Sequence, residues 1–295
     1  MEVQFYDDAA AFLTEAGPFL ERHPLRHTIV ATTAGRLAQS GTEASGPRWF
    51  AVVRDGVDLV GVVMRTHPEP PHAGFVPSLP EAAVAAVTAG LAGRGERVSA
   101  WNGDLDAARA LCAAAAEGAP VQVVLHTRLF ELHEVVWPRR PEGALRQAGA
   151  DDEDLVAAWV REFRLDSEVQ GGRTPDPTWQ ANRETIRAHL AAGSFWLWEM
   201  GGSSVHLTGV QPAMFGVSRI GPVYTPAEQR GRGYAAWVVA VLSQRLLDAG
   251  VRPCLYTDQA NPVSNEIYQR IGYVKVRDEG NVVVADQHMV QARES

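Results

Sequence analysis

The second half of the sequence alternates between helical and strand-like hydrophobic patterns. Leu155, Ala158, Trp159 and Phe163 recur at spacings of three and four, which predicts an amphipathic helix beginning near residue 151. Strand patterns bounded by turn residues precede and follow it. The further helices predicted for this half cover 179–192, 233–249 and 262–271, the last with Asn261 as its N-cap and Pro262 as its first residue. The predicted strands cover 144–148, 194–199, 205–210, 219–225, 253–257, 273–277 and 281–285.

The first half repeats this order in outline. Its predicted helices cover 7–21, 25–38, 80–92 and 105–117, and its predicted strands cover 49–56, 59–64, 98–102, 121–126 and 130–136. Between the halves, two prolines, two arginines and a glycine within 137–143 are typical of an extended connector. We therefore predict one fold used twice, with domains at 1–138 and 144–295 and a linker at 139–143. The fold class is α/β (α+β), each domain being a mixed, mostly antiparallel sheet with flanking helices.

Composition narrows the class without naming a function. A chain of 295 residues suits two domains, and 46% hydrophobic residues suffice for two cores. A net charge of -8 argues against nucleic acid as a partner. Cys112 and Cys254 are too far apart for a disulfide framework or a zinc pattern, so we expect buried thiols and no metal. The sequence has neither a signal-peptide pattern nor an apolar run of membrane-spanning length, so we expect a cytoplasmic protein.

A loop rich in Gly and Arg precedes the predicted helix at 233–249. Gly231 and Gly233 would let the backbone approach an anion closely, and the free N–H groups of a helix start attract phosphate. Arg230 and Arg232 add positive charge. A dinucleotide fingerprint would need its first glycine directly after the first strand of a βαβ unit, and this loop does not meet that condition. A plain helix start with solvated arginines is the alternative interpretation.

The pattern Arg230-x-x-Gly233-x-Ala235 resembles the acyl-CoA pyrophosphate loop of the GNAT superfamily of N-acetyltransferases. A second segment, from Asn261 through Tyr268 to Gly272 and Tyr273, resembles the other signature of that superfamily. The resemblance covers about 144–290. The first half lacks the loop, because 75–80 lead straight into a helix, and it resembles a degenerate copy.

The resemblance implies a cosubstrate site for acetyl-CoA. Backbone groups of Val223 and Thr225, which flank Tyr224, would bind the pantetheine arm as an added strand does. The N–H groups of the loop would hold the pyrophosphate, in the segment Arg230, Gly231, Arg232, Gly233, Tyr234 and Ala235. Asn261 would contact pantetheine, and Asn261, Ser264 and Tyr268 share a helix face at spacings of three and four.

The implied reaction is direct acyl transfer from acetyl-CoA to a primary amine of a small molecule or peptide. Tyr268 would protonate the departing thiolate, and a backbone N–H near Val223 would stabilise the oxyanion. Asp258 is the favoured general base, because strand ends face the cleft in such folds, although it could instead cap the next turn. The other base candidates are Glu162, Glu168, Glu199 and His206.

Two further interpretations remain open at this point. One is a tandem acetyltransferase similar to mycothiol synthase, and another is a non-catalytic acyl-CoA-binding sensor. A relation to the peptidoglycan aminoacyltransferases is opposed by the intact pyrophosphate loop. The chain could also form a homodimer through its degenerate half, and the identity of the amine is not predicted.

Overall fold

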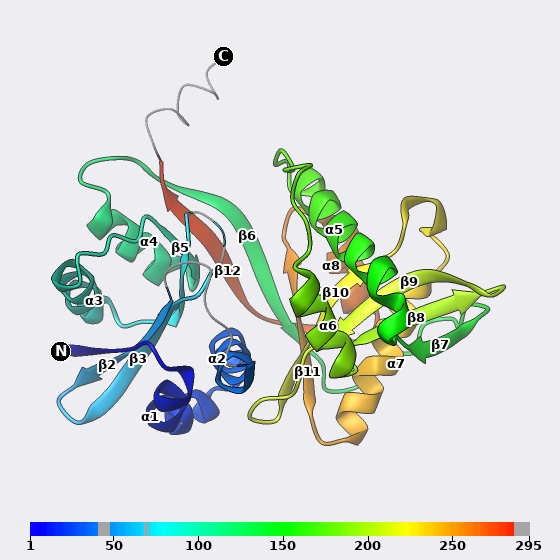
Figure 1. Ribbon diagram of the computed structural model, residues 1–295, viewed down its shortest axis with the longest axis horizontal. Helices are drawn as coiled ribbons and strands as arrows, with labels where there is room; N and C mark the ends of the chain where they lie inside the picture. Colours follow the sequence, from blue (N-terminus) through cyan, green and yellow to red (C-terminus); the bar gives the residue numbers. More distant parts are fainter. Residues whose placement is uncertain (41–47, 68, 70, 286–295) are drawn as a thin grey trace, which may run out of the picture. The chain divides into compact units, whose positions relative to one another are not determined.

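The computed structural model describes residues 1–40, 48–67, 69 and 71–285 (Figure 1). The chain divides into two compact units: unit 1 is Met1–Thr127 with Asp278–Ser295, and unit 2 is Arg128–Arg277. The chain leaves unit 1 within strand β6 (Val121–Glu131) and returns to it within strand β12 (Val274–Val284). In this division the predicted linker at 139–143 lies inside unit 2.

Unit 2 follows the predicted order of strands and helices closely. Its strands are β7 (Ala144–Gln147), β8 (Phe195–Met200), β9 (Ser203–Val210), β10 (Val217–Tyr224) and β11 (Arg252–Asp258). Its helices are α5 (Glu153–Gln170), α6 (Arg183–Ala191), α7 (Tyr234–Asp248) and α8 (Pro262–Arg270). Helix α6 begins later than predicted because the Asn182 side chain accepts the Thr185 N–H at 2.9 Å and so caps the helix there.

The sheet of unit 2 runs in the order β11-β10-β9-β8-β7. Only β10 and β11 are parallel, and the other neighbours in this run are antiparallel. Helices α5 and α6 pack on one face, where Val156 and Leu190 meet Leu207. Helices α7 and α8 lie on the other face (Figure 1), where their buried residues cluster with Trp198. The mixed, mostly antiparallel sheet with flanking helices confirms the predicted fold class.

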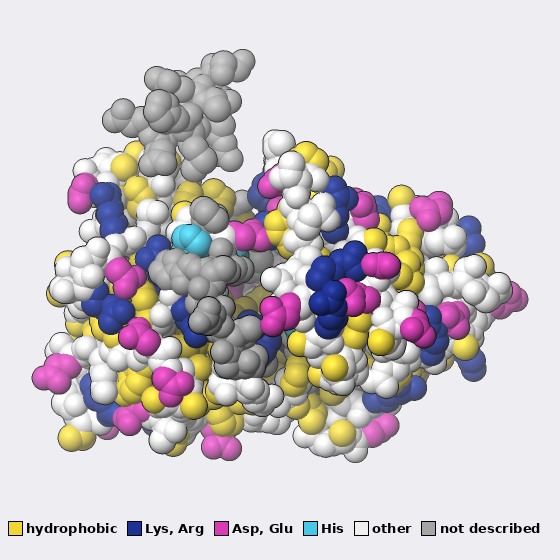
Figure 2. All heavy atoms as spheres, viewed as in Figure 1, with side chains coloured by type: hydrophobic (Ala, Val, Ile, Leu, Met, Phe, Trp, Pro, Cys, Tyr) yellow, Lys and Arg dark blue, Asp and Glu magenta, His cyan; other side chains and the backbone are white. Residues whose placement is uncertain are grey.

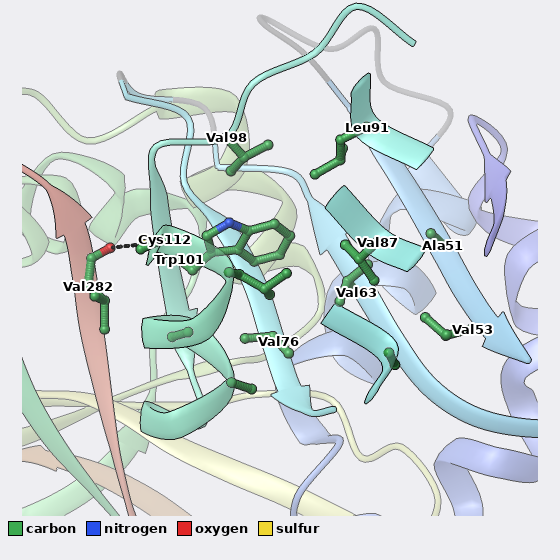
Figure 3. Packing of buried hydrophobic residues seen from close by; sticks show 14 of the residues in the cluster. Ala51, Val53, Val63, Val76, Val87, Leu91, Val98, Trp101, Cys112 and Val282 are labelled. Carbon is green, nitrogen blue, oxygen red and sulfur yellow. Dashed lines mark hydrogen bonds between the residues drawn. The ribbon is translucent and has the colours of Figure 1, made fainter. Parts of the chain in front are cut away.

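Unit 1 repeats this order of elements. Its strands are β1 (Glu2–Tyr6), β2 (Trp49–Asp55), β3 (Asp58–Arg65), β4 (Gly74–Ser78) and β5 (Ala100–Gly103). Its helices are α1 (Ala9–Arg22), α2 (Thr28–Ser40), α3 (Glu81–Gly93) and α4 (Leu105–Ala115). The hydrophobic pattern did not reveal β1 and β4. Trp101 lies in the core of this unit with Val87 and Cys112, whose thiol faces the Val282 carbonyl at 3.4 Å (Figure 3).

The last strands of both halves differ from the prediction. The expected pairs at 121–126 and 130–136, and at 273–277 and 281–285, are the single strands β6 and β12. Gly280 lies between the two strands predicted at 273–277 and 281–285, where a glycine is typical of a turn. In the fold, a Cβ there would lie 2.8 Å from Leu105 and 3.1 Å from the Leu125 carbonyl, so this glycine permits close packing within a continuous strand.

The last strand of the second half, β12, pairs with a strand of unit 1. Gly280 of β12 pairs with Gly103 of β5, so the final strand of the second half completes the sheet of unit 1. Within the residues that the structure describes, no helix combines the length and hydrophobicity that crossing a bilayer requires.

Candidate active site

Strands β10 and β11 separate partway along their length. Their parallel pairing is limited to residues 217–219 with 252–254, although β10 continues to Tyr224 and β11 to Asp258. On its other side β10 stays paired to β9, with a register shift between Ile220 and Val223. A shift of this kind is a bulge, which bends a strand away from its regular path. The two strands therefore expose unpaired backbone edges to each other.

A cavity of about 100 Å³ fills the opening between these strands. Its lining comes from α5, β10, β11 and α8: Phe163, Ser167, Gln170, Ile220, Gly221, Pro222, Val223, Leu255, Tyr256, Thr257, Asp258, Asn261, Ser264 and Tyr268. Five residues predicted from sequence thus share one cavity: Val223, Asp258, Asn261, Ser264 and Tyr268. The other predicted residues lie outside this lining, on the loop and at the ends of β10 and α7.

The sequence prediction missed the contribution of α5. Phe163, Ser167 and Gln170 line the cavity, and their spacings of four and three put them on one helix face. Phe163 belongs to the hydrophobic face predicted from sequence, but Ser167 and Gln170 are polar and carry no hydrophobic signal that would place them on a cavity.

Asn261 is the N-cap of α8. Its side-chain carbonyl accepts the Ser264 N–H at 3.1 Å, and its amide donates to Gln170 Oε1. Nearby, Thr257 donates to Asn265 Oδ1 at 2.7 Å, and Asn265 donates to the Asp258 carbonyl at 3.0 Å. These bonds hold the start of α8 to the end of β11, and so they fix one wall of the cavity.

Tyr268 sits on the cavity lining in an otherwise buried position, 8% exposed. Its ring meets Tyr273 edge-on, with ring centroids 6.0 Å apart. Burial raises the pKa of the Tyr268 hydroxyl above its ordinary value of about 10. The hydroxyl therefore keeps its proton at neutral pH. The hydroxyl of Tyr273 lies away from the cavity and is bonded to Ser243 at 2.8 Å.

Asp258 lies at the cavity but is already engaged. One carboxylate oxygen accepts from Arg173 Nη1 at 3.2 Å, and the other accepts the Ala260 N–H at 2.8 Å. The capping role that the sequence left open for Asp258 is therefore present. Its role as a general base stays a prediction, and it would require Arg173 to yield part of the ion pair.

The other base candidates lie outside the cavity lining. His206 is fully buried, and burial lowers its pKa to about 3, so the imidazole is neutral and weakly basic. Glu162, Glu168 and Glu199 form ion pairs with arginines, at 2.8 Å to Arg161, 3.3 Å to Arg164 and 2.6 Å to Arg146 respectively. Asp258 is the one acidic residue on the described lining.

The loop between β10 and α7 fits a phosphate group. Gly233, the N-cap of α7, has φ +84° and offers no capping side chain, and the first turn contains no acidic residue. Gly231 also has a positive φ, +76°. A Cβ built at either glycine would meet nothing within 4 Å, so the space before the helix is open. The N–H groups of this turn are available to an anion, as pyrophosphate binding requires.

The arginine side chains of this loop make hydrogen bonds and an ion pair within the protein. Arg230 Nε donates to the Thr225 carbonyl at 3.0 Å, and its guanidinium pairs with Asp166. Arg232 donates to the Glu228 carbonyl at 3.4 Å. These bonds brace the loop, and the backbone dipoles of α7 add positive potential at the start of the helix.

The aromatic residues that bracket the loop point into the protein. Tyr224 is buried beside Trp159, with ring centroids 6.0 Å apart, and burial raises the pKa of its hydroxyl. The Tyr234 side chain is buried, and its hydroxyl donates to Met200 Sδ at 3.1 Å. Among these predicted residues, Tyr224, Tyr234 and Ala235 therefore offer a ligand their backbone groups.

Unit 1 lacks the equivalent opening in its described part. Strand β5 pairs with β4 from Trp101 to Gly103, where it ends, and the Asp104 N–H then bonds to the Val76 carbonyl at 2.8 Å. Only Leu79 and Pro80 separate β4 from α3. The Trp101 indole occupies the core beside these strands (Figure 3). No Gly-rich loop precedes the helix here.

Comparisons with known proteins agree with this geometry. Residues 214–282 match the model of the FR47-like protein family, and this segment contains β10, the loop, α7, β11 and α8. A Drosophila protein of known structure superimposes with a TM-score of 0.64 at 13% identity, covering 96% of this chain and 98% of that one. A GNAT-family acetyltransferase from Colwellia psychrerythraea gives 0.57 at 9% identity, with the same coverage. No curated protein matches the sequence.

A further similar structure is a tandem GNAT protein from the clavulanic acid biosynthesis pathway, with a TM-score of 0.57 at 15% identity and coverage of 95% of this chain and 97% of that one. The chain has the GNAT fold. At these identities the similarity establishes the fold alone. Because these matches extend over nearly the whole chain, the similarity of fold includes unit 1 as well as unit 2.

Proposed function

We propose that this chain is an acetyl-CoA-dependent N-acetyltransferase that acetylates a primary amine of a small molecule or peptide. The observation that carries the proposal is the combination of the open N-terminus of α7 with the cavity between β10 and β11, on whose lining Tyr268 keeps its proton. A phosphate-binding turn that follows a strand with a free edge suits a long, extended thioester substrate.

The residues of unit 2 divide the binding of acetyl-CoA among them. The backbone of Val223 and Thr225 would pair with the pantetheine arm, and the N–H groups of 230–235 would hold the pyrophosphate. Asn261 and Ser264 line the same cavity and would contact the arm from α8. Bound acetyl-CoA supplies an activated acetyl group, and no metal is required for its transfer.

The chemical step needs two proton movements. As the amine nitrogen bonds to the acetyl carbon and the carbon–sulfur bond breaks, the Tyr268 hydroxyl would donate its proton to the sulfur. The amine gives up a proton, and Asp258 would accept it. The N–H of Val223 would stabilise the negative charge on the carbonyl oxygen. Pro222 has no N–H, so Val223 is the first donor after the bulge.

The partners follow from charge and surface character. Acidic and basic side chains are interspersed on the face seen in Figure 2, and the net charge of -8 disfavours a polyanion. We therefore infer a small or peptide amine as acceptor and neither nucleic acid nor membrane as a partner. We also infer a cytoplasmic location and one cosubstrate site per chain, in unit 2, with unit 1 free to support a homodimer.

Calorimetric titration with acetyl-CoA, followed by an assay of free thiol with an amine library, tests this proposal. We expect one site per chain and thiol release that depends on the amine. Absence of binding would refute the proposal, and two equal sites would refute the assignment of unit 1. Binding without amine-dependent release would favour the acyl-CoA-binding sensor.

A further inference from the structure

His206 forms a buried hydrogen-bonded chain beneath the loop. Its Nδ1 lies 2.8 Å from Thr225 Oγ1, and its Nε2 lies 2.7 Å from Thr208 Oγ1. His206 and Thr208 are fully buried residues of β9, the strand that pairs with β10. A buried imidazole that satisfies both of its nitrogens is held in one orientation.

The Thr225 end of this chain is where β10 leaves the sheet. Strand β10 ends at Tyr224, and register pairing with β9 stops there, opposite Leu207. Beyond that point Thr225 is held by two contacts: its hydroxyl bonds to His206, and its carbonyl accepts from Arg230 Nε at 3.0 Å. Thr225 therefore joins the buried imidazole to the first residue of the phosphate-binding turn.

We propose that His206 is a positioning residue for the cosubstrate loop. Through the Thr225 hydroxyl it fixes the exit of β10, and through the Thr225 carbonyl it fixes Arg230 and the turn that precedes α7. This inference rests on the proposed function, because the loop has a ligand to position only if acetyl-CoA binds there. It assigns no chemical step to His206.

The neutral state of the ring gives each nitrogen a separate task. A neutral imidazole has one donor and one acceptor nitrogen. Since a hydroxyl can donate or accept, in either tautomer Nδ1 contacts the Thr225 hydroxyl and Nε2 contacts the Thr208 hydroxyl. The loop depends on the Nδ1 side, and the Thr208 side serves to orient the ring.

Paired substitutions separate the two sides. The amide of Asn reaches about where Nδ1 lies, and the amide of Gln about where Nε2 lies, so His206→Asn keeps the bond to Thr225 and His206→Gln does not. We expect the Kd for CoA to rise about 10-fold in His206→Gln and to change less than about 3-fold in His206→Asn. Thr208→Val, which leaves the Thr225 bond in place, is the matched control and should resemble His206→Asn.

Variants of Thr225 keep the test decisive if both His206 variants fold poorly. Thr225→Val, which removes the hydroxyl, should raise the Kd for CoA about 10-fold. Thr225→Ser, which keeps the hydroxyl, should have a Kd close to that of the wild type. In the assay of activity, His206→Gln and Thr225→Val should raise the KM for acetyl-CoA and change kcat little. A general loss of structure would not produce this pattern. If the wild type binds CoA and every variant binds it with the wild-type Kd, this inference is overturned and the proposed function stands. Absence of CoA binding by the wild type would overturn the proposed function together with it.

Discussion

Replacing Gly233 by Ala tests the phosphate-binding turn directly. Gly233 has φ +84° and ψ 3°, and an added Cβ meets no atom within 4 Å, so the substitution causes no overlap in the free protein. Its cost is conformational, about 1–2 kcal/mol for a left-handed residue with a side chain. Ala also lowers the conformational entropy of the unfolded chain, which offsets this cost by ~0.5 kcal/mol. We therefore expect a net loss near 1 kcal/mol, or about 2–4 °C in Tm.

The effect on the ligand should be larger than the effect on the fold. A methyl group in the open space before α7 would keep a phosphate from one or two N–H groups. Hydrogen bonds to a charged group contribute about 1.5–3 kcal/mol each, so the Kd for acetyl-CoA should rise by at least ~10-fold. Calorimetric titration at fixed ionic strength measures this change, and thermal unfolding measures the stability.

Gly202 provides a matched control in the turn between β8 and β9. Its φ is +80°, and an added Cβ there also meets nothing within 4 Å. Gly202→Ala should therefore lower Tm by a similar amount and leave acetyl-CoA affinity unchanged. Equal affinities of the Gly233→Ala and Gly202→Ala variants would refute the assignment of this turn to phosphate.

Two further predictions concern titrating groups. Tyr268→Phe should lower kcat at least ~10²-fold with little change in the Kd for acetyl-CoA, as removal of a general acid does, whereas Tyr273→Phe should lose only the stability of its bond to Ser243; unchanged turnover in Tyr268→Phe would remove it from the mechanism. His206 has a pKa of about 3 in the folded protein and about 6.5 when unfolded, so the stability from its burial is complete above pH 6.5 and falls as the pH drops towards 3. Between pH 7 and pH 5 this loss amounts to ~2 kcal/mol in chemical denaturation, and His206→Asn should lack it; an identical pH dependence in both proteins would contradict the buried, neutral assignment.

Local signals predicted much of unit 2. Asn261 followed by Pro262 gave the start of α8, and Gly233 gave the start of α7, because caps and helix starts depend on residues close in sequence. The same locality explains the errors at β6 and β12. Whether Gly280 turns the chain or permits close packing depends on Leu105 and Leu125, which are distant in sequence.

The roles of individual site residues were less accessible. The sequence favoured Asp258 as a base, but its bond to Arg173 depends on how the segment after α5 folds back over β11. Trp196 and Trp198 pack on the α7 side of the sheet, where the Arg245 guanidinium lies 4.7 Å from the centroid of the Trp196 ring, and this contact too joins residues distant in sequence.

By itself, the sequence determined the order of elements from β7 to α8, the Gly-rich turn and the helix face that carries Asn261, Ser264 and Tyr268. These are short-range properties set by backbone preference and by helical spacing. Only the tertiary structure decided that β10 and β11 part after residues 219 and 254 and that α5 lines the cavity between them. It also decided that β12 completes the sheet of the other unit. Strand pairing and cavity lining join residues far apart in the chain, and hydrophobic periodicity records which face is buried without recording which partner buries it.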